Sequence, residues 1–211
     1  MQKDYNYLFK ISIVGGRGSG KTCYFNRYIE DSFEPLDSSP SFEDNHTGSG
    51  LRRKTINFND NCIIRLLLFD YNNNSIFRID DEFYEEIQRS NGIILTYDIC
   101  NRSSFNDCIR DYQIINPNGS DRYRIILVGT KLDIAEIDEK KRKVTYDEGK
   151  LFADQQGLEF YETSSKQNIG VHQSMLTLIG QILDGIENKY NDSNSNSNNN
   201  NNNNKSKCTI Q

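Results

Sequence analysis

The sequence predicts an α/β domain built on a mostly parallel sheet, and three observations lead to that prediction. Short hydrophobic runs bounded by turn residues recur through residues 1–190. Longer stretches with helical periodicity separate these runs, which is the pattern of strand–helix–strand units. Some runs, such as residues 125–128, are apolar without interruption, as is typical of strands buried on both faces. We therefore expect six strands in one sheet, with helices on both of its faces.

The expected strands follow the chain in order. Each is a hydrophobic run of strand length that is bounded by turn residues. They cover residues 8–14, 55–58, 62–69, 92–98, 124–129 and 158–162.

Helices are expected to begin near Lys21, Asp80, Ser104, Thr145 and Ile169. The fourth opens with Thr145 and Glu148, whose spacing lets each side chain cap a free backbone amide of the other. The last helix carries apolar residues at helical spacing, and this pattern predicts a stripe that faces the core. The residues of the stripe are Val171, Met175, Leu178, Ile179, Ile182 and Ile186.

The chain divides into one domain, residues 1–190, and a tail, residues 191–211. After Tyr190 the composition changes to Asn and Ser, with an unbroken run of Asn over residues 198–204. Such a segment has no apolar surface whose burial would offset chain entropy, so we expect a disordered tether. The basic run at residues 140–143 is expected to be a solvated loop before the fourth helix.

Composition and charge disfavour several classes of protein. The formal net charge of −5 argues against sequence-independent binding to nucleic acid, which needs clustered positive charge. The sequence shows no signal peptide and no apolar stretch long enough to cross a bilayer, so a cytosolic location is expected. The five cysteines are odd in number and include no CxxC pair, which argues against a disulfide framework and a zinc site. Inert or buried thiols are expected at Cys23, Cys62, Cys100 and Cys108.

The sharpest motif lies between the first expected strand and the first expected helix. It matches the phosphate-loop pattern in the strand–loop–helix context that the pattern requires. Its glycines let the backbone wrap around a β-phosphate, and amides at the helix N-terminus point at that phosphate. Lys21 is expected to reach the β and γ oxygens, and the Thr22 hydroxyl to bind Mg²⁺. The expected nucleotide contacts are Gly15, Gly16, Arg17, Gly18, Ser19, Gly20, Lys21, Thr22 and Cys23.

Two later motifs follow the last two expected strands. Thr130-Lys131-Leu132-Asp133 follows the fifth strand, and Glu-Thr-Ser-Ser-Lys at residues 162–166 follows the sixth. Together with the phosphate loop, and in this order, they resemble the Ras superfamily of small GTPases, most closely its Rab-like members. The resemblance spans about residues 8–183. It implies the phosphate-loop GTPase fold, with GTP or GDP and Mg²⁺ as ligands.

The resemblance also implies how the base is read. Asp133 would accept hydrogen bonds from guanine N1 and N2, which adenine cannot supply, and the stem of Lys131 would lie along the base. Thr130 replaces the commoner Asn, as in Rho-like members, so one contact in the base loop is lost or weakened. Ser165 replaces the usual Ala, but its contact with the guanine oxygen is through the backbone amide. The same loop supplies Ser164 and Lys166.

Besides Thr22, two further residues are expected at the Mg²⁺ site: an aspartate and the threonine of the first switch loop. Asp70 is kept and is expected to organise Mg²⁺ through a water. Direct counting from Thr22 places the switch threonine at Pro40, which has no hydroxyl. Counting back from Asp70 favours Thr47 as the Mg²⁺ ligand, with an ordinary turn residue as the alternative. Phe33 stands where the family keeps a ring over the guanine face, although a core phenylalanine would look the same.

The positions nearest to hydrolysis depart from the family pattern. Asn73 replaces the Gly whose amide meets the γ-phosphate, and Asn74 replaces the Gln that orients the attacking water. The shorter stem of Asn74 displaces the amide, which is expected to slow hydrolysis by about two orders of magnitude. Glu43 or His46 could supply a replacement group. Arg17 stands where related chains hold a small residue, and it could either block an arginine finger or supply positive charge in cis.

Three functions are open to a chain with these motifs: a GTP-hydrolysing switch, a GTP-binding module with little or no hydrolysis, and a phosphate-loop kinase. A kinase function would leave unexplained the two motifs at residues 130–133 and 162–166, which we call the first and second base-side motifs, so it is least favoured. A slow switch is favoured, because the binding positions keep the pattern and the hydrolytic positions do not. The resemblance implies a monomer with effector proteins, exchange factors and activators at two switch loops, residues 33–50 and 71–81. It places the switch in membrane or vesicle trafficking or in signalling.

The C-terminal residues Cys208-Thr-Ile-Gln211 fit the CaaX prenylation pattern, in which a final Gln favours a farnesyl group. A cysteine beyond a polar tether, flanked by Lys205 and Lys207, has no evident structural role. One prenyl chain gives only marginal and reversible membrane binding. We therefore expect Cys208 to be lipidated, and the protein to exchange between the cytoplasmic face of a membrane and the cytosol.

Overall fold

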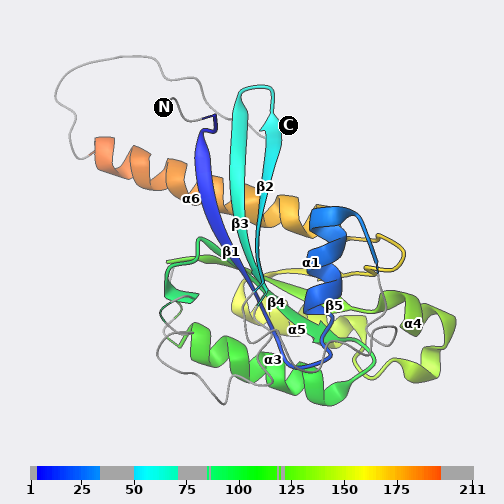
Figure 1. Cartoon of the computed structure of the whole chain (residues 1–211). Coiled ribbons are helices and arrows are strands. Elements are labelled where there is room, and N and C mark those ends of the chain that lie inside the picture. Colours follow the sequence, from blue (N-terminus) through cyan, green and yellow to red (C-terminus); the bar gives the residue numbers. More distant parts are fainter. Residues whose placement is uncertain are drawn as a thin grey trace.

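The computed structural model describes residues 4–33, 50–70, 85, 87–117, 119 and 122–195, with side chains described as far as Tyr190. In this part of the chain, six strands form one sheet in the order β2-β3-β1-β4-β5-β6 (Figure 1). β2 runs antiparallel to β3, and the other neighbouring pairs are parallel. This confirms the predicted α/β fold. The strands are β1 Tyr7–Val14, β2 Gly50–Asn59, β3 Cys62–Asp70, β4 Gly92–Asp98, β5 Arg124–Thr130 and β6 Glu159–Glu162.

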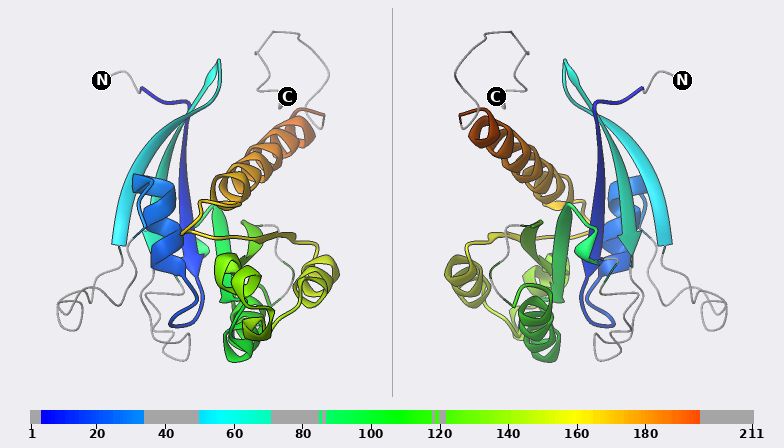
Figure 2. Two further views of the ribbon diagram at one scale, coloured as in Figure 1. Left: turned by 90° about the vertical axis from the view of Figure 1, so that its right-hand side faces the viewer. Right: turned by 90° about the vertical axis from the view of Figure 1, so that its left-hand side faces the viewer.

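Helices cover both faces of the sheet (Figure 2). Side chains of α3 and α5 pack in one core, and those of α1 and α6 pack in a second core. In β4, Ile93 and Leu95 belong to the first core and Ile94 to the second, because successive side chains of a strand point to opposite faces. The helices with described bounds are α1 Lys21–Glu30, α3 Arg102–Ile115, α4 Leu132–Ile137, the 3₁₀ helix η3 Glu139–Lys141, α5 Tyr146–Gln156 and α6 Val171–Ser195.

Caps account for two of the helix starts. The Asn101 side chain accepts hydrogen bonds from the amides of Ser103 and Ser104, so α3 begins two residues before the predicted Ser104. At α5, Thr145 and Glu148 form the predicted reciprocal capping box. The predicted helix start near Asp80 lies outside the described residues, and residues 85, 87 and 88 beyond it are helical.

The parallel arrangement brings the carboxyl ends of the strands to one edge of the sheet. Asp70 ends β3 opposite Ile13 of β1. Asp98 ends β4 opposite Thr130 of β5. The loops that follow these strands therefore leave from a common edge, where polar side chains from distant parts of the sequence can meet.

The second strand is longer than predicted. It begins at Gly50 instead of residue 55, and it pairs with β3 along its whole length. Its first half, with Leu51, Arg52 and Arg53, is exposed. An edge strand has only one neighbour, so its exposed half shows no hydrophobic run from which it could be predicted.

The segment after the fifth strand also differs from the prediction. Helix α4 was not predicted, because six residues give too short a periodic pattern to recognise. The basic run at residues 140–143 is only partly a solvated loop, since η3 covers its start. Arg142 is half-buried and binds both carboxylate oxygens of Glu162 at 2.6 and 2.9 Å. This ion pair ties the segment to β6.

The last helix matches the predicted stripe except at its end. Val171, Met175, Leu178, Ile179 and Ile182 are buried, whereas Ile186 is 38% exposed because the helix has passed the edge of the core there. The helix continues to Ser195, five residues into the segment that was predicted to be a disordered tether. In the described part of the chain, no helix has the length and apolarity that crossing a membrane requires.

Four of the cysteines lie in the described part of the chain, and two of them are buried. Cys23, Cys62, Cys100 and Cys108 form no disulfide, and Cys62 and Cys108 are buried. Burial raises the pKa of the Cys23, Cys100 and Cys108 thiols above the ordinary value. A raised pKa keeps a thiol protonated and poorly nucleophilic.

Candidate functional site

The loop between β1 and α1 is fitted closely against the ends of β4 and β5. A Cβ atom on Gly15 would lie 2.4 Å from the Thr96 carbonyl oxygen, and one on Gly20 would lie 2.8 Å from Thr130 Oγ1. Gly20 also has φ of 83°, in the left-handed region that favours glycine. Packing therefore requires glycine at Gly15 and Gly20, whereas a Cβ atom on Gly18 would meet no atom within 4 Å.

Hydroxyl groups attach this loop to the sheet. Ser19 Oγ lies 2.9 Å from Thr96 Oγ1, which donates to the Val14 carbonyl at 3.0 Å. Thr130 Oγ1 donates to the Ser19 carbonyl at 2.7 Å. Thr130 thus connects the phosphate-loop motif to the first base-side motif. The sequence showed only that Thr130 replaces the commoner Asn and did not predict this contact.

Lys21 is a buried cation with few partners. Its side chain is 5% exposed, and Nζ donates to the Gly15 and Gly16 carbonyls at 2.7 and 2.9 Å. Burial lowers the pKa of Lys21, although the charges of Asp70 and Asp111 act in the opposite direction. Among the described residues, the hydrogen bonds of this ammonium group go to loop carbonyls, so the buried group is well placed to accept an anion.

Asp70 and Thr22 converge beside this lysine. Thr22 Oγ1 donates to Asp70 Oδ2 at 2.7 Å. Asp70 is 5% exposed, and its Oδ1 is buried without a hydrogen-bond partner in the described part of the chain. Burial raises the pKa of Asp70, with Thr22 and Lys21 lowering it. A hydroxyl and a carboxylate with one unsatisfied buried oxygen form a donor set suited to Mg²⁺, which takes few protein ligands and keeps several waters.

Besides the contact of Thr130, side chains at Lys131 and Asp133 hold the first base-side motif. Lys131 has left-handed backbone, with φ of 65°, and its Nζ donates to Asp98 Oδ2 at 2.8 Å. Asp133 lies in the first turn of α4, is 7% exposed and accepts a hydrogen bond from Ser164 Oγ at 2.7 Å. Asp133 and Ser164 join the two base-side motifs directly.

The second base-side motif is fixed by its own backbone and by α1. Ser164 and Ile169 exchange backbone hydrogen bonds at 3.0 and 2.9 Å, and Ser164 Oγ accepts from the Gln167 amide at 3.0 Å. Arg27 of α1 donates from Nε to the Ser165 carbonyl at 2.6 Å. Lys166 is exposed. The three motifs therefore form one contiguous network at the carboxyl edge of the sheet.

Several residues of this network carry no motif signal. Asp98 could have been noticed as a polar residue at the end of a buried strand, but Arg27 and Asp111 lie inside helices and look like ordinary surface residues. Asp111 of α3 is 6% exposed and faces the core side of its helix. Burial raises its pKa to about 7, against the lowering effects of Arg110 and Lys21.

The remaining predicted site residues are placed as follows. Arg17 lies exposed in the turn of the loop, and Gly18 is exposed beside it. Cys23 and Phe33 are half-buried. Thr47, Asn73, Asn74 and Cys208 lie outside the described residues, as do Glu43 and His46.

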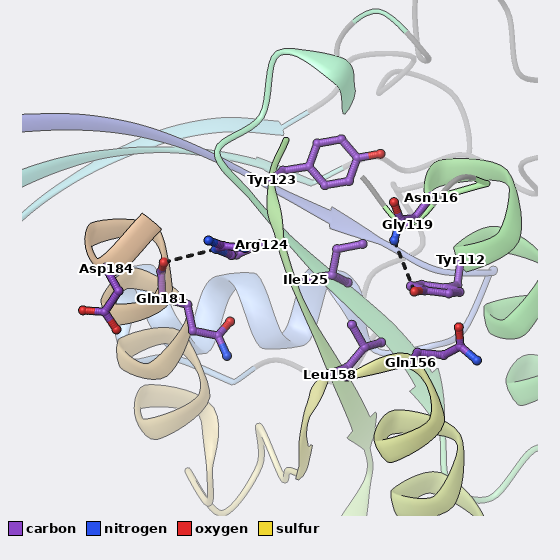
Figure 3. Close-up of a pocket in the computed structure, with 11 residues that line it drawn as sticks. Tyr112, Asn116, Gly119, Tyr123, Arg124, Ile125, Gln156, Leu158, Gln181 and Asp184 are labelled. Atoms are coloured by element: carbon purple, nitrogen blue, oxygen red, sulfur yellow. Dashed lines mark hydrogen bonds between the residues drawn. The ribbon is translucent and has the colours of Figure 1, made fainter. Parts of the chain in front are cut away.

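A separate cavity of about 370 Å³ lies at the opposite end of the sheet (Figure 3). Arg124 and Ile125 at the start of β5 line it, together with Leu158 before β6. Tyr112 and Asn116 form its wall near the end of α3, where Asn116 Nδ2 donates to Tyr112 Oη at 3.2 Å. None of the predicted site residues lines this cavity, so the motif residues and the cavity are distinct features.

Comparison with known proteins agrees with this geometry. Residues 10–184 match the model of the Ras family. Ras-related protein RIC1 of Oryza sativa subsp. japonica is 33% identical over 86% of this chain and 84% of its own length. GTP-binding protein yptV2 of Volvox carteri is 34% identical over 89% of this chain and 81% of its own length. Ras-related protein Rab-8B of Homo sapiens is 33% identical over 92% of this chain and 87% of its own length. The chain therefore belongs to the Ras family.

Proposed function

We propose that the chain is a guanine-nucleotide-binding switch that takes GTP or GDP with Mg²⁺ and hydrolyses GTP slowly. The observation that carries this proposal is the pairing of two buried, under-satisfied charges, Lys21 and Asp70, with a pre-formed base-side network around Asp133. Family membership supports the same function, since one relative is named a GTP-binding protein.

The phosphate half would use Lys21 and the loop backbone. Lys21 would exchange its contacts with the Gly15 and Gly16 carbonyls for phosphate oxygens, which are stronger acceptors for an ammonium group. The amides at the start of α1 would add further donors at the positive end of the helix dipole. Thr22 and Asp70 would hold Mg²⁺, Asp70 through a water. Bound Mg²⁺ would neutralise part of the charge on the β and γ phosphates.

The base half would read guanine through one carboxylate and one amide. Asp133 accepts from Ser164 through Oδ1, and a carboxylate has further lone pairs for guanine N1 and N2. The Ser165 amide would donate to the guanine oxygen, while the Lys131 stem would lie along the base. Because adenine presents no donor at N1, these groups would select against ATP.

Slow hydrolysis is proposed from the sequence at Arg17, Asn73 and Asn74. We expect the double variant Asn73→Gly with Asn74→Gln to raise the single-turnover rate by about 10- to 100-fold, because it restores the positioned water. GTP affinity should change little, since these groups act mainly in the transition state. A wild-type rate equal to that of an ordinary small GTPase would contradict the slow-switch proposal.

A peripheral membrane location is also proposed, through prenylation of Cys208. Thr47 completes the proposed Mg²⁺ ligands, and effectors and exchange factors would bind the two switch loops. Cys208→Ser should move the protein from the membrane fraction to the cytosolic fraction of cells. An unchanged distribution would rule out the prenyl anchor without affecting the nucleotide proposal.

Equilibrium binding tests the function as a whole. Nucleotide-free protein is titrated with fluorescent GTP and ATP, with and without Mg²⁺. We expect GTP to bind at least 100-fold more tightly than ATP, because each lost hydrogen bond to a charged group costs about 1.5–3 kcal/mol. Equal affinity for the two nucleotides would end the guanine assignment. Tight GTP binding with no turnover would favour the interaction module over the switch.

A further inference from the structure

Arg27, near the end of α1, makes hydrogen bonds in two directions. Towards the second base-side motif, Nε donates to the Ser165 carbonyl at 2.6 Å and Nη2 to the Lys166 carbonyl at 3.4 Å. Towards its own helix end, Nη1 donates to the Asp31 carbonyl at 2.7 Å and to Asp31 Oδ1 at 3.1 Å. All three guanidinium nitrogens are therefore engaged, and they connect two segments that are far apart in the sequence.

The two ends of this contact differ in exposure. The Arg27 side chain is 13% exposed, whereas that of Asp31 is 72% exposed. Asp31 caps the end of α1 in left-handed conformation, with φ of 51°, and also accepts from Asn168 Nδ2 at 3.1 Å. Asp31 thus orients the guanidinium from the solvent side, while the half-buried Arg27 supports the loop.

Only a planar fork can make these contacts together. A guanidinium presents five donors in fixed directions, whereas an ammonium is a single point that cannot span the Ser165, Lys166 and Asp31 acceptors. The other described supports of the loop act at Ser164, through Asp133 and Ile169. Among the described residues, Arg27 is the support on the Ser165 side.

The position of the contact gives it a consequence for binding. Helix α1 begins at Lys21, directly after the phosphate-loop glycines, and ends where the chain enters the predicted first switch loop. The Ser165 amide is the proposed donor to the guanine oxygen. Arg27 holds the Ser165–Lys166 peptide through the Ser165 carbonyl, and the backbone bonds with Ile169 hold Ser164 on the other side. The Ser165 amide lies between these two fixed points, so its direction is restrained from both sides.

We propose that Arg27 is a positioning residue that holds the Ser165 amide for guanine and couples it to Asp31 at the entrance of the first switch loop. This proposal rests on the proposed function. A partner protein that displaces Asp31 removes half of the guanidinium's hydrogen bonds, so the base-reading loop loosens and nucleotide leaves faster.

The first test measures dissociation of fluorescent GDP from full-length protein in Mg²⁺ after mixing with excess unlabelled GDP. Arg27→Ala should raise the dissociation rate by about tenfold, as expected for the loss of one or two hydrogen bonds that support the site. Arg27→Lys should raise it nearly as much, although it keeps the charge. Asp31→Ala should raise it by about two- to fourfold, because the Ser165 and Lys166 contacts remain.

A matched control is Arg89→Ala. Arg89 forms an exposed ion pair with Glu85, both side chains being 65% exposed, before the amino end of β4. This variant should leave the dissociation rate unchanged. If Arg27→Ala does not fold, Arg27→Lys and Asp31→Ala still carry the test.

The second test separates positioning from general loosening of the fold. Affinities are measured for GDP and for 2-aminopurine riboside diphosphate, which lacks the oxygen at position 6 and also the proton on N1. The missing N1 contact with Asp133 weakens the analogue in wild type and variant alike, so each variant is compared with wild type on the same nucleotide. Arg27→Ala should lower GDP affinity about tenfold and leave affinity for the analogue within about twofold. An equal loss for both nucleotides, or an unchanged GDP dissociation rate in Arg27→Lys, would overturn the proposal. A wild-type protein that does not prefer GDP over ADP would instead refute the proposed function.

Discussion

The two halves of the candidate site are built differently. In the base half, Lys131, Asp133 and Ser164 each have a side-chain partner at 2.7–2.8 Å. In the phosphate half, Lys21 is held by loop carbonyls, and Asp70 Oδ1 is buried with no hydrogen-bond partner among the residues that the structure describes. The base half is therefore pre-organised. The phosphate half instead contains two buried charged groups, Lys21 and Asp70, whose free hydrogen-bonding capacity a ligand can use.

Because of this difference, we expect the base half to determine which nucleotide binds and the phosphate half to determine how tightly it binds. A pre-organised network selects its ligand at little cost, since few groups must be ordered on binding. Buried charges without full partners destabilise the free protein and favour any ligand that neutralises them. Variants in the base half should therefore change which nucleotide binds, and variants in the phosphate half should change affinity and the stability of the free protein in opposite directions.

The largest effect is expected at Lys21. Lys21→Met keeps most of the stem and removes the charge, so GTP affinity should fall by about 100- to 1,000-fold with the loss of two charged hydrogen bonds. The nucleotide-free protein should lose no stability, because a buried cation is removed. Isothermal titration and thermal unfolding of the free protein measure the two effects. A large drop in the unfolding temperature would show that Lys21 supports the fold instead.

The next effect is a change of ligand at Asp133. Asp133→Asn replaces an acceptor by a donor, so GTP affinity should fall about 100-fold and xanthosine triphosphate affinity should rise. The Ser164 hydrogen bond can persist, because the amide keeps an acceptor oxygen. Competition binding with both nucleotides measures the ratio. A parallel loss for both would mean that Asp133 holds the loop without reading the base.

Asp70 should show opposite effects on Mg²⁺ binding and on stability. Asp70→Asn removes a buried carboxylate with an unsatisfied oxygen, so the free protein should gain about 1–2 kcal/mol in free energy of unfolding. The same change should abolish most of the Mg²⁺ dependence of GTP affinity. Denaturant unfolding and GTP titrations with Mg²⁺ or EDTA check both. Full Mg²⁺ dependence in the variant would exclude Asp70 from the metal site.

The last effect concerns stability alone and is a pH dependence at Asp111. Its pKa is raised by burial to about 7, so the contribution of this group to stability is greatest below the ordinary value of 3.8 and is lost as pH rises through 7. Asp111→Asn cannot ionise, so its stability advantage over wild type should grow by about 1–3 kcal/mol between pH 5 and pH 8. Denaturant unfolding at the two pH values measures this growth. A difference that is independent of pH would contradict the buried, neutral state of Asp111.

Much of the fold was predictable because burial leaves a clear pattern. Strands β1, β3, β4 and β5 lie between neighbours and read as hydrophobic runs, so their predicted bounds are within one residue of the observed ones. β2 lies at the edge of the sheet, and its exposed Leu51–Arg53 stretch carried no such run. The short helix α4 and the half-buried Arg142–Glu162 pair also left no periodic signal.

The sequence by itself determined the site residues that depend on local spacing. The phosphate loop needs glycines, a lysine and a hydroxyl within eight residues, and such a pattern is visible along the chain. The base-side motifs each lie within five residues. These motifs also implied the family, which the match over residues 10–184 confirms.

Only the tertiary structure decided how these local motifs support each other. Thr130 contacts Ser19 across 111 positions of the chain, and Arg27 contacts Ser165 across 138. Parallel strands bring such residues together at one edge of the sheet, and no local pattern in the sequence predicts these contacts. The same is true of the burial of Asp111, since its exposure depends on what packs over α3 and not on its neighbours in sequence.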